Sequence, residues 1–180
     1  MQTYVALFRG INVGGSNLLP MKALRELLEQ NACLDVQTYI QSGNAIFRSV
    51  ISDPNRLARQ VTAAVSKRHG FEPRVLVLTR QSLERAVAGN PFVEAAKDPT
   101  SVHVFFLEGV PKKPDLKMLD ALRTPTERFA LRGSVFYLHT PDGFGKSKLA
   151  ARVERSLGVA ATARNWRTVA TLLEMASADA

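Results

Sequence analysis

The segment RGINVGG, residues 9–15, combines residue types that hold anions in loops. A glycine-rich loop exposes backbone N–H groups, and at the start of a helix these groups add to the positive end of the helix dipole. Arg9 supplies a planar guanidinium that matches phosphate or carboxylate. The structural alternative is that glycine and asparagine only provide the conformations of tight turns. The glycine spacing differs from the dinucleotide fingerprint G-x-G-x-x-G, so we expect no Rossmann site.

A second segment, GFGKSKL over residues 143–149, lies between a predicted strand and a predicted helix. Thr140 stands where a Walker A loop requires its first glycine, which argues against ATP hydrolysis by a P-loop. Two interpretations stay open. One is a looser anion site at the start of the helix, and the other is a capped helix with a solvated basic face; both involve Lys146, Ser147 and Lys148.

A third segment, ATARNWRTV over residues 161–169, places Arg164, Asn165 and Arg167 around the only tryptophan, Trp166, which we expect in the core. Lys and Arg number 24 against 16 Asp and Glu, and basic residues are densest between residues 143 and 168. Positive charge favours anionic partners, nucleic acid among them, although it is equally typical of a solvated surface.

Other catalytic groups are sparse. The three histidines, His69, His103 and His139, are far apart and lack the spacing of metal ligands. The single cysteine, Cys33, argues against a thiolate zinc site, and we expect it to be buried. We therefore expect no metal and no cofactor, and whether the protein is an enzyme stays open. Phosphoryl transfer would require a carboxylate to hold Mg²⁺, and Asp142 is the carboxylate nearest to these loops.

Composition indicates a globular protein of 180 residues, long enough for one domain or two small ones. The lone cysteine suits a reducing compartment. The N-terminus lacks the pattern of a signal peptide, and the longest strongly apolar run, Val102–Leu107, is too short to span a bilayer. We expect a cytoplasmic protein without a membrane partner.

Hydrophobic periodicity predicts the order β-α-β-β-α-β over residues 1–80, which is typical of a ferredoxin-like fold. The predicted strands are 3–8, 36–41, 45–50 and 74–78. The second helix begins after Asp53 as N-cap and ends at Gly70, and Gly43-Asn44 is predicted to turn the hairpin. A bridging helix and linker fill residues 81–100.

Residues 101–180 nearly repeat this pattern, with predicted strands at 101–107, 128–132, 134–139 and 159–163 and helices at 114–122 and 148–157. A further helix, 165–175, follows. We therefore predict an α+β protein of two ferredoxin-like (split βαβ) halves with antiparallel sheets, the second half ending in an extra C-terminal helix.

The predicted topology brings the loops together, because the first and second strands of such a sheet run the same way. The loop after the first strand then lies beside the hairpin after the second. We predict a ligand site there that contains Arg9, Asn12, Gly14, Gly15, Gln41, Ser42 and Asn44. If the halves face each other, the second half adds Lys146, Ser147, Lys148, Arg164, Asn165 and Arg167.

Six blocks in this order, RGINVGG, PMKALRELLE, VQTYIQSGNAIF, NPF, GFGKSKL and ATARNWRTV, resemble a bacterial family known as domain of unknown function 1697. The resemblance runs from Tyr4 to about Leu173 and implies a single-copy cytoplasmic α+β protein of this length, but no activity.

Three functional hypotheses follow from the sequence. The first is a binder of a phosphorylated or otherwise anionic small ligand, a nucleotide among the options. The second is an RNA-binding module that uses the basic stretch 146–167. The strand order suits an RNA-recognition motif, yet the third strand, NAIFRSV, lacks its glycine-aromatic signature. The third is a structural or partner-binding protein. The oligomeric state stays open.

Overall fold

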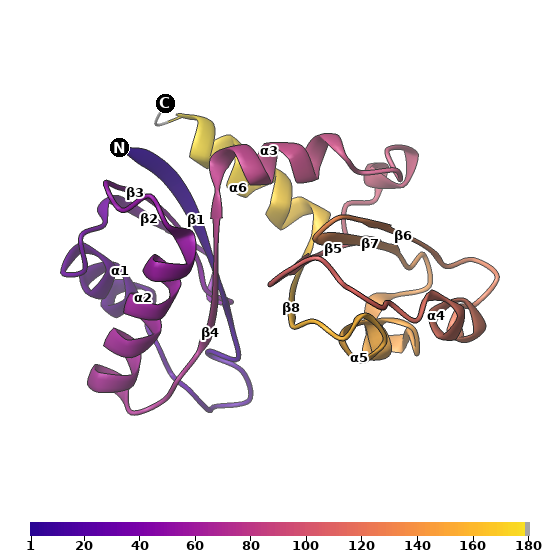
Figure 1. Ribbon diagram of the computed structural model, residues 1–180, viewed down its shortest axis with the longest axis horizontal. Coiled ribbons are helices and arrows are strands. Elements are labelled where there is room, and N and C mark those ends of the chain that lie inside the picture. The colour runs from indigo at the N-terminus through magenta and orange to yellow at the C-terminus, as the bar shows by residue number, and fades with distance from the viewer. Residues whose placement is uncertain (179–180) are drawn as a thin grey trace. The chain divides into compact units, whose positions relative to one another are not determined.

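The computed structural model describes residues 1–178, which divide into two compact units (Figure 1). The first unit comprises Met1–Arg85 together with the chain from Thr171 onward, and the second comprises Ala86–Ala170. Two helices, α3 (Arg80–Ala88) and α6 (Trp166–Ala178), pass from one unit into the other. We describe each unit by itself.

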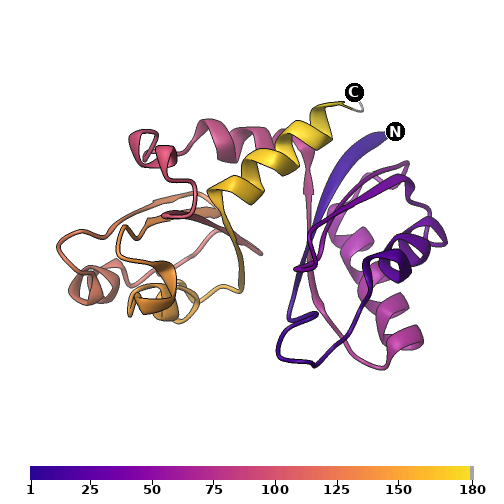
Figure 2. The same ribbon diagram turned by 180° about the vertical axis from the view of Figure 1, so that it is seen from behind.

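The first unit is a four-stranded antiparallel sheet in the order β2-β3-β1-β4. Two helices lie on one side of it (Figures 1 and 2). This is the ferredoxin-like arrangement that the sequence predicts. Its elements are β1 (Gln2–Arg9), α1 (Met21–Glu29), β2 (Leu34–Tyr39), β3 (Asn44–Ser49), α2 (Pro54–His69) and β4 (Arg74–Thr79).

The core of the first unit lies between the sheet and its two helices, where the strands contribute aromatic side chains. Tyr4, Phe8 and Phe47 are fully buried against residues of α1 and α2. The face of the sheet opposite to these helices carries Val5 and Leu7, which are also fully buried. The three aromatic rings therefore do not form the exposed stacking surface that an RNA-recognition motif uses.

The second unit repeats the topology, with a sheet in the order β6-β7-β5-β8. Phe105, Phe136 and Leu138 pack against Leu119 of α4 and against Val153 and Leu157 of α5. The prediction of two ferredoxin-like halves and a final helix is confirmed. The elements are η1 (Glu94–Lys97), β5 (Val102–Leu107), α4 (Leu116–Leu122), β6 (Arg128–Arg132), β7 (Val135–His139), η2 (Phe144–Lys146), η3 (Ala150–Arg152), α5 (Val153–Leu157) and β8 (Ala161–Asn165).

The predicted boundaries of α2 are confirmed by their local chemistry. The Asp53 carboxylate accepts a hydrogen bond from the Asn55 N–H at 2.9 Å, and Pro54 opens the helix. Gly70 ends it in the left-handed conformation with φ of +76°. Each of these groups satisfies or replaces a backbone donor or acceptor that the helix end leaves unpaired.

Several predictions are wrong in detail. The hairpin between β2 and β3 turns through the four residues 40–43, with positive φ at Ile40 and Gly43, whereas Asn44 is already the first residue of β3. The helix predicted for 148–157 is split, because the Ser147 hydroxyl accepts the Ala150 N–H and starts a 3₁₀ turn ahead of α5. In addition, the last strand is Ala161–Asn165 rather than 159–163, and Trp166 is only half-buried.

Gly43 occupies a position that has no room for a side chain. A Cβ atom there would lie 2.4 Å from Ile11 Cδ1 and 2.7 Å from Phe8 Cβ, and its φ is +80°. Gly70 has nearly the same φ, +76°, and open space around it. The two glycines therefore separate the cost of a left-handed backbone from the cost of a steric clash.

We expect Gly70→Ala to lower the free energy of unfolding by about 1–2 kcal/mol through backbone strain alone. Gly43→Ala carries the same strain and adds roughly 1–3 kcal/mol for overpacking. Urea unfolding of both variants measures the difference. Equal losses in the two variants would contradict the close packing at Gly43.

Candidate functional site

The loop after β1 and the β2–β3 hairpin meet at one edge of the first unit, as the topology predicts. The Phe8 N–H donates to the Gly43 carbonyl at 2.8 Å, and the Asn12 side-chain amide donates to the Gln41 carbonyl at 2.9 Å. We call this region the loop edge and define it as residues 9–19 and 40–44. Seven of the predicted site residues belong to it: Arg9, Asn12, Gly14, Gly15, Gln41, Ser42 and Asn44.

Asn12 holds the loop edge together through three hydrogen bonds. Besides its bond to Gln41, its amide nitrogen donates to the Leu19 carbonyl at 2.9 Å, and its Oδ1 accepts the Leu19 N–H at 2.8 Å. Its φ of +54° is one that asparagine tolerates better than most residues. Both amide hydrogens are committed to the backbone, so the Asn12 side chain positions the loop.

Gly14 and Gly15 form the tip of a small hairpin within the loop edge. Val13 and Ser16 pair across them, and both glycines have positive φ, +59° and +76°, as in a type I′ turn. Both glycines are exposed. The tip does not enter α1 directly, because that helix begins only at Met21. The glycine segment therefore lacks the helix dipole that the sequence interpretation gave it.

On the hairpin side of the loop edge, Asn44 is fully buried. Its amide nitrogen donates to the Tyr39 carbonyl at 3.0 Å and to the Ser42 hydroxyl at 3.3 Å. Gln41 and Ser42 are exposed. Asn44 thus shapes the turn, while Gln41 and Ser42 present their side chains at its surface.

Arg9 lies directly opposite Arg74 in the antiparallel register of β1 and β4. The preceding pair, Phe8 and Val75, packs into the helix-side core, so the two arginines project from the other face of the sheet. Both are exposed. Like charges directly opposite each other destabilise a sheet, which makes this pair unusual. Sequence reasoning missed Arg74, because only the strand register places it beside Arg9.

The predicted site residues of the second unit separate into capping and exposed groups. Ser147 is buried and its hydroxyl accepts the Ala150 N–H at 3.0 Å, while Asn165 Oδ1 accepts the Thr168 N–H at 2.9 Å at the start of α6. Lys146, Lys148 and Arg167 are exposed. The loop that carries Lys146 is fixed by Phe144, whose ring stacks on His103 with a centroid distance of 3.8 Å.

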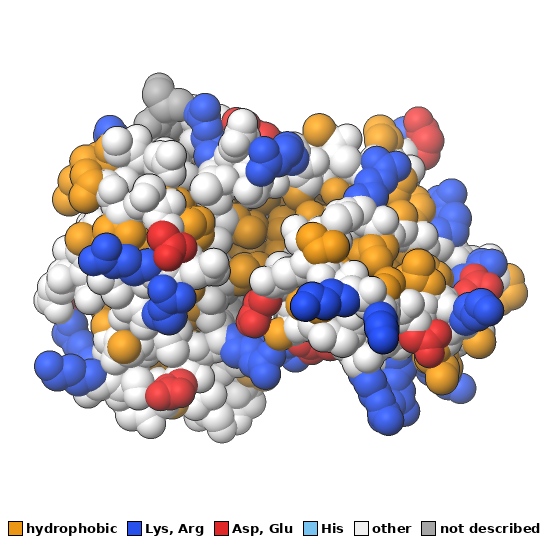
Figure 3. Space-filling view, viewed as in Figure 1, with side chains coloured by type: hydrophobic (Ala, Val, Ile, Leu, Met, Phe, Trp, Pro, Cys, Tyr) orange, Lys and Arg blue, Asp and Glu red, His pale blue; other side chains and the backbone are white. Residues whose placement is uncertain are grey.

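Arg164 differs from the other basic residues of this stretch, because burial lowers its pKa to about 10. It pairs with Val104 in the register of β5 and β8, on the sheet face opposite to α4 and α5, and one guanidinium nitrogen donates to the Ala163 carbonyl at 2.9 Å. Arg164 is therefore less exposed than Lys146, Lys148 and Arg167. On the side shown in Figure 3, Lys and Arg side chains are spread over each unit with Asp and Glu between them.

His139 belongs to a small cluster in the second unit. Its Nδ1 lies 3.3 Å from an Arg128 nitrogen, and the Arg128 guanidinium lies 5.3 Å from the Phe92 ring centroid. Burial lowers the pKa of His139, the Arg128 charge lowers it further, and Asp98 raises it.

The Asp142 carboxylate accepts a hydrogen bond from the Thr126 hydroxyl at 2.6 Å. Within residues 1–178, no three His, Cys, Asp or Glu side chains assemble into a metal site.

These observations define an α+β protein of two ferredoxin-like units with an arginine-bearing loop edge. The chain belongs to the family of proteins of unknown function DUF1697, whose sequence profile matches residues 1–137. The family resemblance read from the sequence is thereby confirmed over these residues, and the blocks GFGKSKL and ATARNWRTV lie beyond them.

A solved structure of a conserved bacterial protein from Streptococcus pneumoniae is similar to this chain, with a TM-score of 0.77 and 23% identity over 97% of this chain and 98% of that one. At this identity the similarity shows the fold. No curated protein matches the chain. None of the described helices combines the length and apolar character that crossing a membrane requires.

We expect Asn12→Ala to lower the free energy of unfolding by roughly 2–3 kcal/mol, since it removes three hydrogen bonds and a favoured left-handed residue. The matched control is Asn17→Ala, because Asn17 has a φ of +51° and donates a single exposed bond to the Gly10 carbonyl. Amide exchange at Leu19 is the second readout, and it should quicken only in the Asn12 variant. A loss no larger than that of the control would contradict the anchoring role.

The His103–Phe144 stack predicts a specific pH dependence of stability. Burial lowers the pKa of His103 from 6.5 to about 4, and its Nδ1 is buried without a hydrogen-bond partner among the described residues. The folded protein therefore holds a neutral ring, and the stability due to His103 is complete above pH 6.5 and is lost as the pH falls towards 4. Because the ring is partly exposed, we expect a loss of about 2 kcal/mol.

The measurement is the unfolding free energy of the wild type and of His103→Phe at several pH values. The variant keeps an aromatic partner for Phe144 but does not titrate, so the difference between the two proteins isolates the histidine. The wild type should lose stability relative to the variant on acidification. A constant difference across this range would show that His103 titrates normally.

Proposed function

We propose that the protein binds a small phosphorylated or otherwise anionic ligand at the loop edge. The observation that carries this proposal is the Arg9–Arg74 pair, two exposed guanidinium groups at directly opposed positions. An oxyanion bound between two neighbouring guanidinium groups makes charge-assisted interactions with both.

The surroundings of this pair support the same ligand class. The Gly14–Gly15 tip is exposed, with open space beside both Cα atoms, and Gln41 and Ser42 add exposed polar groups. Asn12 and Asn44 act as the scaffold that fixes these groups in place. A rigid scaffold that presents a few donors is the usual construction of a ligand site.

In the second unit, the capping roles of Ser147 and Asn165 leave Lys146, Lys148, Arg164 and Arg167 as its anion-binding candidates.

A cytoplasmic location fits the lone thiol of Cys33, which is buried and whose pKa burial raises to about 12. Such a thiol is chemically inert and forms no internal disulfide.

RNA binding is the second candidate, favoured by the exposed side chains of Lys146, Lys148, Arg152, Arg155 and Arg167. Contacts to a phosphate backbone weaken steeply as salt concentration rises, whereas a site that holds one small anion through a few contacts is less affected. Salt dependence therefore separates the two functions.

The test is a thermal-unfolding panel of nucleotides, sugar phosphates and short single-stranded RNA at low and moderate salt, followed by calorimetry with the best small ligand. A ligand at about a hundred times its dissociation constant adds roughly 2.7 kcal/mol and raises Tm by a few degrees. Losing one charge-assisted hydrogen bond costs about 1.5–3 kcal/mol. We therefore expect Arg9→Gln and Arg74→Gln each to weaken binding at least tenfold.

Arg56→Gln is the matched control, since Arg56 is an exposed arginine at the start of α2. It removes the same charge and should leave the affinity nearly unchanged. Equal weakening in all three variants would show that only net charge matters. Stabilisation by RNA alone, abolished at moderate salt, would replace ligand binding with the RNA-binding function.

A further inference from the structure

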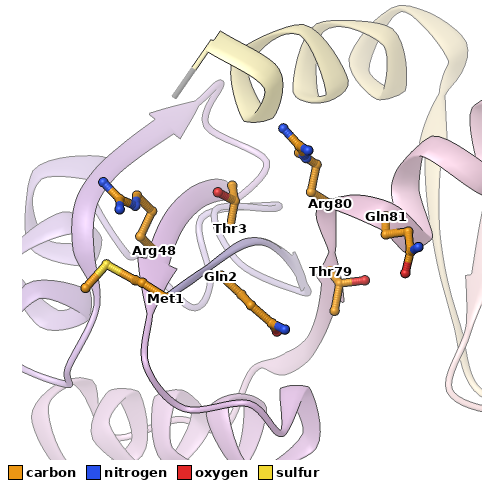
Figure 4. Close-up of a pocket in the computed structure, with 7 residues that line it drawn as sticks. All are labelled: Met1, Gln2, Thr3, Arg48, Thr79, Arg80 and Gln81. Atoms are coloured by element: carbon orange, nitrogen blue, oxygen red, sulfur yellow. The ribbon is translucent and has the colours of Figure 1, made fainter. Parts of the chain in front are cut away.

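A cavity of about 420 Å³ lies at the end of the first unit's sheet where β1 begins (Figure 4). It is within the range of small-ligand sites. None of its lining residues is acidic, and two are arginines. The lining consists of Met1, Gln2, Thr3, Arg48, Thr79, Arg80 and Gln81.

The strand register places Thr3 directly opposite Arg48 on β3. On the other side of β1, Tyr4 is opposite Thr79, the last residue of β4, and Arg80 follows as the first residue of α3. Figure 4 shows the Thr3 side chain between those of Arg48 and Arg80. The Thr3 hydroxyl makes no hydrogen bond to another described residue. Two guanidinium groups thus flank one available hydroxyl.

Each arginine contacts an acidic residue that lies outside the cavity lining. An Arg48 terminal nitrogen lies 3.2 Å from Asp35 Oδ2, and Arg80 Nε lies 3.3 Å from Glu84 Oε1. A guanidinium has five N–H donors, so one contact leaves the others for a ligand. Both side chains remain about 40% exposed, at 41% and 38%. Each ion pair therefore leaves most donors of its guanidinium available.

Thr79 fixes the backbone that carries Arg80. Its hydroxyl oxygen accepts the Ser82 N–H at 3.1 Å and donates to the Ser82 hydroxyl at 2.9 Å, which caps the start of α3. On the other side of the cavity, Gln2 is held by the Tyr4 hydroxyl, which donates to its Oε1 at 2.7 Å. The lining is thus held by hydrogen bonds from several directions.

We propose that this cavity is a second binding site, which takes the phosphate group of a small phosphorylated metabolite between Arg48, Thr3 and Arg80. A hydroxyl flanked by two guanidinium groups suits a tetrahedral oxyanion, because all three groups supply N–H or O–H donors. The volume exceeds that of phosphate alone, and Gln2 and Gln81 add polar side chains to the lining.

The cavity is separate from the loop edge. Thr3 and Arg9 are six residues apart on β1, which corresponds to about 20 Å along an extended strand. Variants at one end therefore leave the other end intact, and the two sites are tested independently.

The experiment is a titration of the protein with inorganic phosphate at constant ionic strength, followed by the backbone amide signals of Thr3 and Arg80 in NMR spectra. We expect saturable shifts of both signals. Arg48→Gln and Arg80→Gln should each raise the dissociation constant at least tenfold, and Thr3→Val, which keeps the shape but lacks the hydroxyl, should raise it several-fold.

Asp35→Asn and Glu84→Gln are the matched controls, because each breaks the same ion pair as the corresponding arginine variant but keeps the guanidinium. Both should bind phosphate as tightly as the wild type or more tightly, and Arg9→Gln should not affect these signals. No saturable shift at Thr3 and Arg80, or equal weakening in the controls, would overturn the site. Binding lost only in the Arg9 and Arg74 variants would overturn it while leaving the loop edge supported.

Discussion

The missing side chain at Gly43 is the constraint on which the loop edge depends. The space that a Cβ would take is filled by Ile11 and Phe8, and the Gly43 carbonyl is in turn the acceptor for the Phe8 N–H. This contact joins the end of β1 to the β2–β3 hairpin by packing and by hydrogen bonding at once. Ile11 is consequently buried, at 1% exposure, although it lies in a loop.

Once Ile11 is fixed, the rest of the loop has little freedom. Asn12 follows it and forms hydrogen bonds with backbone groups of Gln41 and Leu19. Its side chain therefore connects the loop both to the hairpin and to the residues that precede α1. The Gly14–Gly15 tip then projects from a rigid base while its own atoms stay exposed. The buried half of RGINVGG therefore serves the fold, and the exposed half, with Arg9, is the part that the proposed ligand site uses. The structural interpretation of this segment thus applies to its buried residues, and the ligand-binding interpretation applies to its exposed ones.

Local signals predicted most of the fold. Asp53, Gly70 and the apolar stripes depend only on neighbours along the chain, so they can be identified without the partner strands. The face of the sheet on which each side chain of β1 lies could not be predicted, because residues 4–8 are all buried and show no alternation between two faces. The pairing of Arg9 with Arg74, and of Thr3 with Arg48, depends on the register between distant strands. At most one residue of each pair can be identified from the sequence, since the register between strands is set by long-range packing.

The same register explains why arginines gather at both ends of this sheet. Thr3 and Arg9 are six residues apart on β1, and an even separation keeps the side chains of a strand on one face. Between them, Val5 and Leu7 are fully buried on that face. A guanidinium in such a centre would lose its hydration without a matching partner. The arginines are therefore restricted to the two ends, where they stay hydrated. The rule that keeps the centre of the face apolar thus confines them to two separate regions of one small sheet.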